Sequence, residues 1–151
     1  MPVVWEGHAN ILDSHAQTLV CACNVRGVMG KGLAEQFKQR YPLMYEAYVK
    51  DCQADLMWQR GYFLYRVNDD RMIYCFPTKK HWRDNSRIEW IHQGLIKLTE
   101  VYRQEGIQQL AVPALGCGEG HLDWVDVYPL MYGMLDRLDA EVGIHLPFTP
   151  K

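Results

Sequence analysis

The chain has 151 residues, 48% of them hydrophobic, which suits one folded domain with a buried core, and we expect a single domain over residues 1–151. Its net charge of −2 excludes a surface that clamps nucleic acid along its whole length, because such binding rests on many Lys and Arg contacts to phosphate. A signal-like N-terminus and a long apolar stretch are both lacking, so we expect a cytoplasmic protein that does not enter a membrane.

The first part of the chain predicts two strands followed by two helices. Apolar runs indicate strands over residues 3–5 and 18–23, and the second run is apolar on both faces, as in a strand covered from both sides. After Gly32 the apolar residues recur every four positions until Pro42, which predicts a helix that the proline stops. A second short helix follows over residues 45–52.

The middle of the chain predicts a hairpin and then a long helix. Residues 58–67 and 71–76 look like two strands joined by an Asn-Asp-Asp turn, whose side chains can bond their own backbone. Ser86 has Glu89 three residues later, the spacing of a capping box, so we expect a helix to begin at Ser86. Apolar residues at helical spacing continue it until Gly106.

The last part of the chain predicts strand, helix and strand. Residues 109–115 are an apolar, buried strand, and residues 142–146 form the final strand. The helix between them begins near Asp126, which puts Pro129 in its first turn, where a proline is tolerated. Strands alternating with helices, plus one hairpin, predict an α/β fold with a mixed sheet and helices on both faces.

Two glycine-rich turns follow strand-like runs and precede helix-like segments. They are residues 27–32 (GVMGKG) and 116–120 (GCGEG). Their glycine spacing matches neither the dinucleotide fingerprint nor the P-loop. Glycines still permit positive φ and close approach, and successive N–H groups at a strand-to-helix turn form an anion-binding concavity. One such turn is a plain tight connection as often as it is an anion-binding turn. Two such turns at the carboxyl ends of strands favour a diphosphate ligand.

Two lysines and two asparagines lie next to these turns. Lys79 and Lys80 follow a strand, so their side chains point to opposite faces and only one reaches the cleft, unless both are simply solvated. A lysine whose pKa is lowered by desolvation or a neighbouring cation serves as a nucleophile or proton donor. Asn24 ends a strand where it can bond a ribose hydroxyl, and Asn10 either faces the ligand or caps a helix.

A basic, aromatic segment comes directly after the lysines. Lys80, His81, Trp82, Arg83 and Arg87 suit stacking on a base and pairing with a phosphate, although a solvated loop with a buried tryptophan is the alternative. The five cysteines lie mostly in apolar runs, where reduced thiols pack as small hydrophobes, and neither they nor the six histidines have zinc-site spacing. We therefore expect no disulfide, no metal and no cofactor.

Three segments of the sequence together resemble a macrodomain. They are residues 24–34, 76–83 and 112–118, the last followed by Leu122-Asp123-Trp124. In order and spacing they are similar to the DarG branch, the DNA ADP-ribosyl glycohydrolases, which are related to the terminal ADP-ribose protein glycohydrolase of animals. The resemblance covers nearly the whole chain and implies a three-layer α/β/α fold with a mixed, mostly parallel sheet.

The resemblance also implies how ADP-ribose lies across the carboxyl ends of the strands. Asn10 and Ile11 would lie near the adenine and Asn24 near the distal ribose, while Lys79 would be the catalytic residue at the anomeric carbon, as nucleophile or as acid. The other positions that the resemblance assigns to ADP-ribose are Gly27, Val28, Met29, Gly30, Gly32, Thr78, Pro113, Leu115, Gly116, Cys117, Gly118, Glu119, Gly120, His121 and Leu122.

The implied function is removal of ADP-ribose from a base in DNA, most plausibly thymine in a single strand, by a monomer that reverses the modification made by a DarT-like ADP-ribosyltransferase. The basic segment from Lys80 to Arg87 would contact the strand. A second reading changes the substrate to ADP-ribosylated protein carboxylates or O-acyl-ADP-ribose. A third is a binding module without activity, because Gly120 stands where the animal relatives carry a catalytic aspartate.

Overall fold

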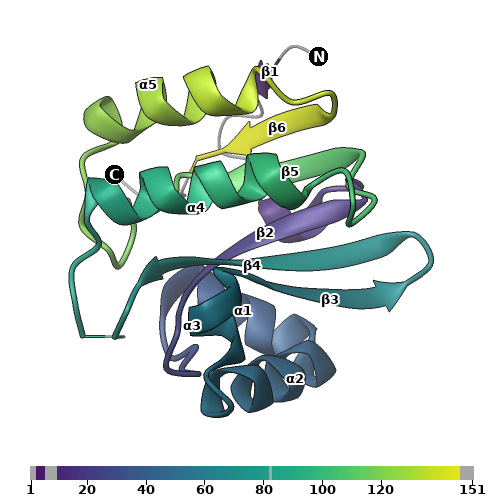
Figure 1. Ribbon diagram of the computed structural model, residues 1–151, viewed down its shortest axis with the longest axis vertical. Coiled ribbons are helices and arrows are strands. Elements are labelled where there is room, and N and C mark those ends of the chain that lie inside the picture. The colour runs from purple at the N-terminus through teal and green to yellow at the C-terminus, as the bar shows by residue number, and fades with distance from the viewer. Residues whose placement is uncertain (1–2, 6–9, 82, 147–151) are drawn as a thin grey trace.

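The computed structural model describes residues 3–5, 10–81 and 83–146, and a six-stranded sheet forms its centre (Figure 1). The strand order is β1-β6-β5-β2-β4-β3. The strands are β1 (Val3–Trp5), β2 (Thr18–Asn24), β3 (Phe63–Asn68), β4 (Arg71–Lys79), β5 (Gln109–Pro113) and β6 (Glu141–His145). All neighbours run parallel except β3 and β4, which form the predicted hairpin. The mixed, mostly parallel sheet is confirmed.

Helices cover both faces of this sheet, which completes the predicted three layers. The α-helices are α1 (Gly32–Arg40), α2 (Pro42–Gln53), α3 (Leu56–Arg60), α4 (Ile88–Val101) and α5 (Trp124–Leu135), and η1 (Ile11–Asp13) is a 3-10 turn. Figure 1 shows α4 and α5 along one face and α1 to α3 along the other. No helix in the described part of the chain has the length and apolar run that crossing a bilayer requires.

Alternation along the central strands divides the core in two. In β2, Leu19 packs with Phe37 and Tyr48 on the side of α1 and α2, while its neighbour Val20 packs with Leu95 on the side of α4. All five of these side chains are fully buried. The uninterrupted apolar run of β2 therefore reflects burial on both faces, as the sequence predicts.

The structure corrects the start of the hairpin. A strand from residue 58 is wrong, because residues 56–60 form the one-turn helix α3 and β3 begins only at Phe63. Asp55 and Gly61 flank this helix in the left-handed region, with φ of 57° and 89°. Met57, which is fully buried, packs α3 into the core on the α2 side, so tertiary packing overrides the strand pattern.

The predicted capping box at Ser86 is also wrong. Helix α4 begins at Ile88 with Arg87 at the N-cap, and no side-chain bond caps it. Ser86 is 5% exposed, and its N–H donates to the carbonyl of Gly120 at 2.9 Å. Ser86 therefore belongs to the second glycine turn instead of the helix.

The start of the last helix lies two residues earlier than predicted. Asp123 caps α5 by accepting a hydrogen bond from the N–H of Val125 at 3.0 Å, so Pro129 lies inside the helix and not in its first turn. The proline leaves the Val125 carbonyl without its helical donor. Val125 is 75% exposed, so water can satisfy that carbonyl and the helix tolerates the proline.

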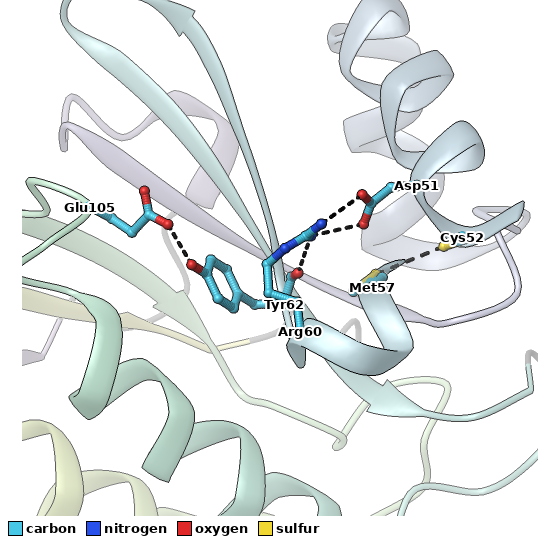
Figure 2. A network of polar contacts seen from close by, with 6 residues as sticks. All are labelled: Asp51, Cys52, Met57, Arg60, Tyr62 and Glu105. Carbon is cyan, nitrogen blue, oxygen red and sulfur yellow. Dashed lines mark hydrogen bonds and ion pairs between the residues drawn. The ribbon is translucent and has the colours of Figure 1, made fainter. Parts of the chain in front are cut away.

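A polar network fixes α3 against α2 and the start of the hairpin (Figure 2). Arg60 donates to both carboxylate oxygens of Asp51 at 3.0 Å and to the carbonyl of Tyr62 at 2.8 Å. The Tyr62 hydroxyl donates in turn to Glu105, and burial together with this bond raises the pKa of Tyr62 to about 12. The hydrogen bonds that Arg60 donates to Asp51 raise the pKa of Arg60, so its guanidinium stays charged. Helix α3 is held at a fixed angle despite its single turn.

Two helical glycines give a matched test of the packing in the α4 and α5 layer. A Cβ at Gly94 of α4 would lie 2.3 Å from Cζ of the buried Phe76, whereas one at Gly133 of α5 would meet nothing within 4 Å. We expect Gly94→Ala to lower the free energy of unfolding by about 1–3 kcal/mol through overpacking. Gly133→Ala should raise it by up to about 1 kcal/mol, since alanine favours the helix. Urea unfolding of both variants checks this, and equal effects would contradict the packing described.

Candidate active site

The carboxyl ends of the parallel strands meet at one edge of the sheet. Asn24 at the end of β2 pairs with Lys79 at the end of β4, and Pro113 at the end of β5 pairs with His145 at the end of β6. The two glycine turns leave from β2 and β5, so they start from this same edge. Ligands of open α/β sheets collect at such an edge.

The first glycine turn is wrapped around the side chain of Asn24. The Asn24 carbonyl oxygen accepts from the N–H of Arg26 at 2.9 Å and of Val28 at 3.4 Å, and its amide donates to the Val28 carbonyl at 2.8 Å. The Tyr48 hydroxyl donates to the Asn24 backbone carbonyl at 2.7 Å. Burial raises the pKa of Tyr48, which keeps this donor protonated. Asn24 thus shapes the turn, and its contact with a ribose stays a prediction.

The first turn packs against α2 and leads into the N-terminus of α1. Gly27, with φ of 88°, lies against α2, where a Cβ would be 3.5 Å from that of Cys52, and Tyr45 donates to the Gly27 carbonyl at 3.2 Å. Gly32 opens α1, and Lys31 at the N-cap supplies no side-chain bond. The first N–H groups of α1 therefore lack intrahelical acceptors, which suits an anion.

The second glycine turn folds back on itself and on Ser86. The N–H of Leu122 donates to the carbonyl of Gly116, which has φ of 77°, at 2.9 Å. Within the described residues, the N–H groups of Gly118, Glu119 and Gly120 donate to no acceptor. Three successive free donors form the kind of concavity that binds a phosphate.

Lys79 joins the two turns. Residue pairing passes from Cys23 opposite Pro77 to Asn24 opposite Lys79, so Thr78 is an extra residue that re-aims the strand end. The Lys79 amine donates to the carbonyl of Glu119 at 3.1 Å. Glu119 in turn lies against the first turn, 3.5 Å from where a Gly32 Cβ would stand. The amine of Lys79 is therefore placed where both turns meet.

Several side chains that the sequence assigned to ADP-ribose are buried, so only their backbone can face a ligand. Ile11, Met29 and Leu115 are at most 2% exposed and belong to the core. Thr78 is 3% exposed and its hydroxyl donates to the Cys23 carbonyl at 3.3 Å. Asn10 caps η1, where its side chain accepts from the N–H of Leu12 at 3.0 Å, which is the capping alternative. Their contacts with ADP-ribose remain predictions.

The basic segment leads away from Lys79. Lys80 points elsewhere, with its Nζ 4.7 Å from the ring centre of Trp58. His81 accepts at Nδ1 from the N–H of Arg83 at 3.1 Å, and Arg87 lies 5.5 Å from the ring centre of Trp90. Trp82 lies outside the described residues. Contact of this segment with nucleic acid stays a prediction.

Two other kinds of reactive group, a cysteine thiol and a bound metal ion, come into question at this edge of the sheet. Burial, followed by the charge of Asp123, raises the pKa of Cys117 to about 11, so its thiol stays protonated at neutral pH and is a poor nucleophile. Among the residues that the structure describes, no three His, Cys, Asp or Glu side chains gather into a group that could hold a metal ion. Lys79 has the amine at which both turns meet.

Two residues of the site escaped the sequence prediction. Tyr48, predicted only as a helix residue, anchors Asn24, and Ser86, predicted as a helix cap, supports the second turn. The Ser86 hydroxyl is buried without a hydrogen-bond partner in the described structure. Both contacts join segments far apart in the chain, so no local pattern could have revealed them.

Comparison with known proteins identifies relatives along most of the chain. The Macro domain family matches residues 20–131. A DNA ADP-ribosyl glycohydrolase of Mycobacterium tuberculosis is 40% identical over 145 residues, which cover 93% of this chain and 41% of that protein. A DNA ADP-ribosyl transferase–DNA ADP-ribosyl glycohydrolase fusion protein of Thermosipho africanus is 39% identical, over 91% of this chain and 40% of its own length. The chain thus spans about two fifths of these relatives.

Solved structures agree along the entire fold. The macrodomain of Mycobacterium tuberculosis DarG has a TM-score of 0.89 at 38% identity, with 97% of this chain and 98% of that chain covered. Thermosipho africanus DarTG in complex with ADP-ribose has a TM-score of 0.87 at 38% identity, over 93% of this chain and 40% of that chain. The chain belongs to the Macro domain family, in the branch of the DarG macrodomains.

Proposed function

We propose that this protein is a hydrolase that binds ADP-ribose and removes it from a modified base in DNA. The observation that carries the proposal is the Lys79 amine, held 3.1 Å from the Glu119 carbonyl at the meeting point of two turns with free N–H groups. Relatives that carry the name DNA ADP-ribosyl glycohydrolase support it, and so does the DarTG structure with ADP-ribose.

The geometry supports a division of labour along the ligand. The N–H groups of the second turn and the start of α1 would bind the diphosphate. The distal ribose, which is bonded to that diphosphate, would thereby be held in place as well. Lys79 would then lie at the anomeric carbon, either attacking it to form a covalent sugar adduct or donating a proton to the departing base. Holding the ligand along its length would supply much of the rate, because the reacting atoms stay in contact distance.

We infer that the base is thymine in a single strand and that the basic segment, Lys80, His81, Trp82, Arg83 and Arg87, meets the strand. A DarT-like ADP-ribosyltransferase would be the source of the modification, as the Thermosipho africanus fusion of both activities suggests for its own chain. We further propose a cytoplasmic protein that acts as a monomer and a single domain over residues 1–151. Its proposed partners are ADP-ribose, ADP-ribosylated single-stranded DNA and the transferase.

Release of ADP-ribose from two substrates tests this function. The substrates are a single-stranded oligonucleotide ADP-ribosylated on one thymine and a peptide ADP-ribosylated on one glutamate. We expect the kcat/KM for release from the oligonucleotide to be at least about tenfold above that for the peptide. This ratio corresponds to about 1.4 kcal/mol of difference in transition-state binding between the two substrates. Preference for the peptide would replace DNA by protein carboxylates as substrate.

A second candidate function is ADP-ribose binding without cleavage. The observation in its favour is Gly120, where the resemblance places the catalytic aspartate of the animal relatives. A Cβ there would lie 2.3 Å from the Ser86 hydroxyl oxygen, so this turn has no room for that side chain. Calorimetry showing ADP-ribose binding, with release from neither substrate, would establish this reading.

A further inference from the structure

A hollow lies next to the candidate active site, and none of the residues that line it is among those assigned to ADP-ribose. Its volume is about 390 Å³. The residues that line it are Lys80, Asp84, Asn85, Ser86, Arg87 and Trp90. It adjoins the site at two points, because Lys80 follows the catalytic Lys79 and Ser86 supports the second glycine turn.

Trp90 and two cations, Lys80 and Arg87, line this hollow, and Trp58 lies beside it across the Lys80 amine. The Lys80 amine lies 4.7 Å from the ring centre of Trp58 and 5.7 Å from that of Trp90. Arg87 lies 5.5 Å from the ring centre of Trp90. Aromatic faces beside cations form the platform on which proteins stack single-stranded bases while pairing with the phosphates.

Trp58 offers its ring to a partner from a rigid position. It is 52% exposed, although its neighbour Met57 is fully buried. Arg60, two residues later in the same helix, is fixed to Asp51 of α2, as Figure 2 shows. A base that stacks on this ring meets a helix whose backbone is already fixed, so binding does not have to order that backbone.

Ser86 connects the hollow to the second glycine turn. It is 5% exposed, and its hydroxyl, which has no hydrogen bond within the described structure, lies against Gly120, 2.3 Å from where a Cβ of that glycine would stand. Asp84 is the one carboxylate of the lining and accepts from the N–H of His81 at 3.2 Å, while Lys80 and Arg87 give the lining two positive charges.

We propose that Trp58, Trp90 and Lys80 form a platform for a nucleotide that flanks the modified base in a single strand. A neighbouring base stacks on Trp58, and the adjoining phosphate pairs with Lys80 and Arg87. The proposal rests on the proposed function, since the platform serves the strand that carries the ADP-ribose. A duplex does not fit it, because bases inside a duplex are already stacked on each other.

Trp58→Ala tests the platform with substrates of two lengths. They are a thymidine mononucleotide carrying ADP-ribose and a single-stranded oligonucleotide with the same modified thymine. The ratio of kcat/KM for the oligonucleotide to that for the mononucleotide should fall roughly tenfold, as expected for one lost stacking contact. Lys80→Ala should lower the same ratio and flatten its dependence on salt concentration, because a phosphate contact is lost. Trp58→Phe, which keeps a stacking face, should restore most of the ratio.

Matched controls separate the platform from a general loss of aromatic or charged surface. Tyr132→Ala removes an exposed ring from α5, and Lys38→Ala removes an amine that lies 4.7 Å from the ring centre of Tyr45. Both should leave the ratio unchanged. Equal effects of Trp58→Ala on the two substrates, or a ratio like that of Tyr132→Ala, would overturn the platform.

A binding measurement distinguishes failure of the platform from failure of the hydrolase function. The affinity of an unmodified single-stranded oligonucleotide is measured by tryptophan fluorescence for the unsubstituted protein and for Trp58→Ala. Weaker binding by the variant supports the platform even if neither substrate is cleaved, in which case only the hydrolase proposal falls. Cleavage of both substrates with unchanged oligonucleotide affinity and an unchanged ratio overturns the platform alone.

Discussion

Lys79→Ala is expected to lower the rate of ADP-ribose release from modified DNA by about 10²–10⁴-fold, the range for loss of a positioned proton-transfer group. ADP-ribose affinity should change little. The reason is that the diphosphate would be held by backbone N–H groups, which the substitution leaves in place, while the Lys79 amine supplies the reactive atom beside Glu119. Single-turnover release and calorimetry with ADP-ribose measure the two effects separately.

Lys50→Ala is the control for the loss of a lysine, since Lys50 is exposed in the last turn of α2. It should match the unsubstituted protein in both measurements. Turnover that persists in Lys79→Ala would exclude the mechanism proposed here. A loss of affinity as large as the loss of turnover would make Lys79 a binding residue.

Gly120→Ala is expected to weaken ADP-ribose binding about tenfold or more. A Cβ at this position would lie 2.3 Å from the Ser86 hydroxyl oxygen and 2.5 Å from the Gly116 carbonyl oxygen, so the second turn must open to admit it. Overpacking of this kind costs about 1–3 kcal/mol, here through the backbone that presents the free N–H groups. Calorimetry with ADP-ribose measures the effect.

Gly118→Ala gives the matched comparison within the same turn. A Cβ at Gly118 would meet nothing within 4 Å, and its φ is not positive. Its affinity for ADP-ribose should fall less than that of Gly120→Ala and stay within about threefold of the unsubstituted protein, because the alanine keeps the N–H and its methyl group meets no atom of the turn; a change of this size is about 0.5 kcal/mol. If both variants bind alike, the close contact with Ser86 does not shape the turn.

Much of the sheet could be predicted from the sequence, because its signals are local. The double-sided apolar run of residues 18–23 and the alternation of strands with helices both report burial, and burial decides these elements. The helix at Leu56–Arg60 could not be predicted, since Met57 is drawn into a core made by distant segments. The prediction that Ser86 caps a helix was wrong for a related reason, because its hydrogen-bond partner is Gly120, more than thirty positions away.

The candidate site was predictable where glycines and a lysine mark it, and hidden where tertiary contacts build it. The two turns and Lys79 stand out in the sequence because few residue types other than glycine adopt a positive φ readily, and because lysine is the side chain with a nucleophilic amine. The bonds of the Asn24 side chain to the backbone of Arg26 and Val28 had no signal in the sequence, and its contact with a ribose stays a prediction. The exposure of Trp58 could not be predicted, because it depends on helix α3, where the sequence pattern indicated a strand.

The wrapping of the first turn around Asn24 has a consequence for ligand capture. Its backbone conformation is set internally, by the Asn24 amide and the Tyr48 hydroxyl, before any diphosphate arrives. A diphosphate that binds as proposed would meet a turn whose backbone is already in place, so association would cost less chain entropy than with a mobile loop. Recognition of this part of ADP-ribose would then be closer to lock-and-key than to induced fit.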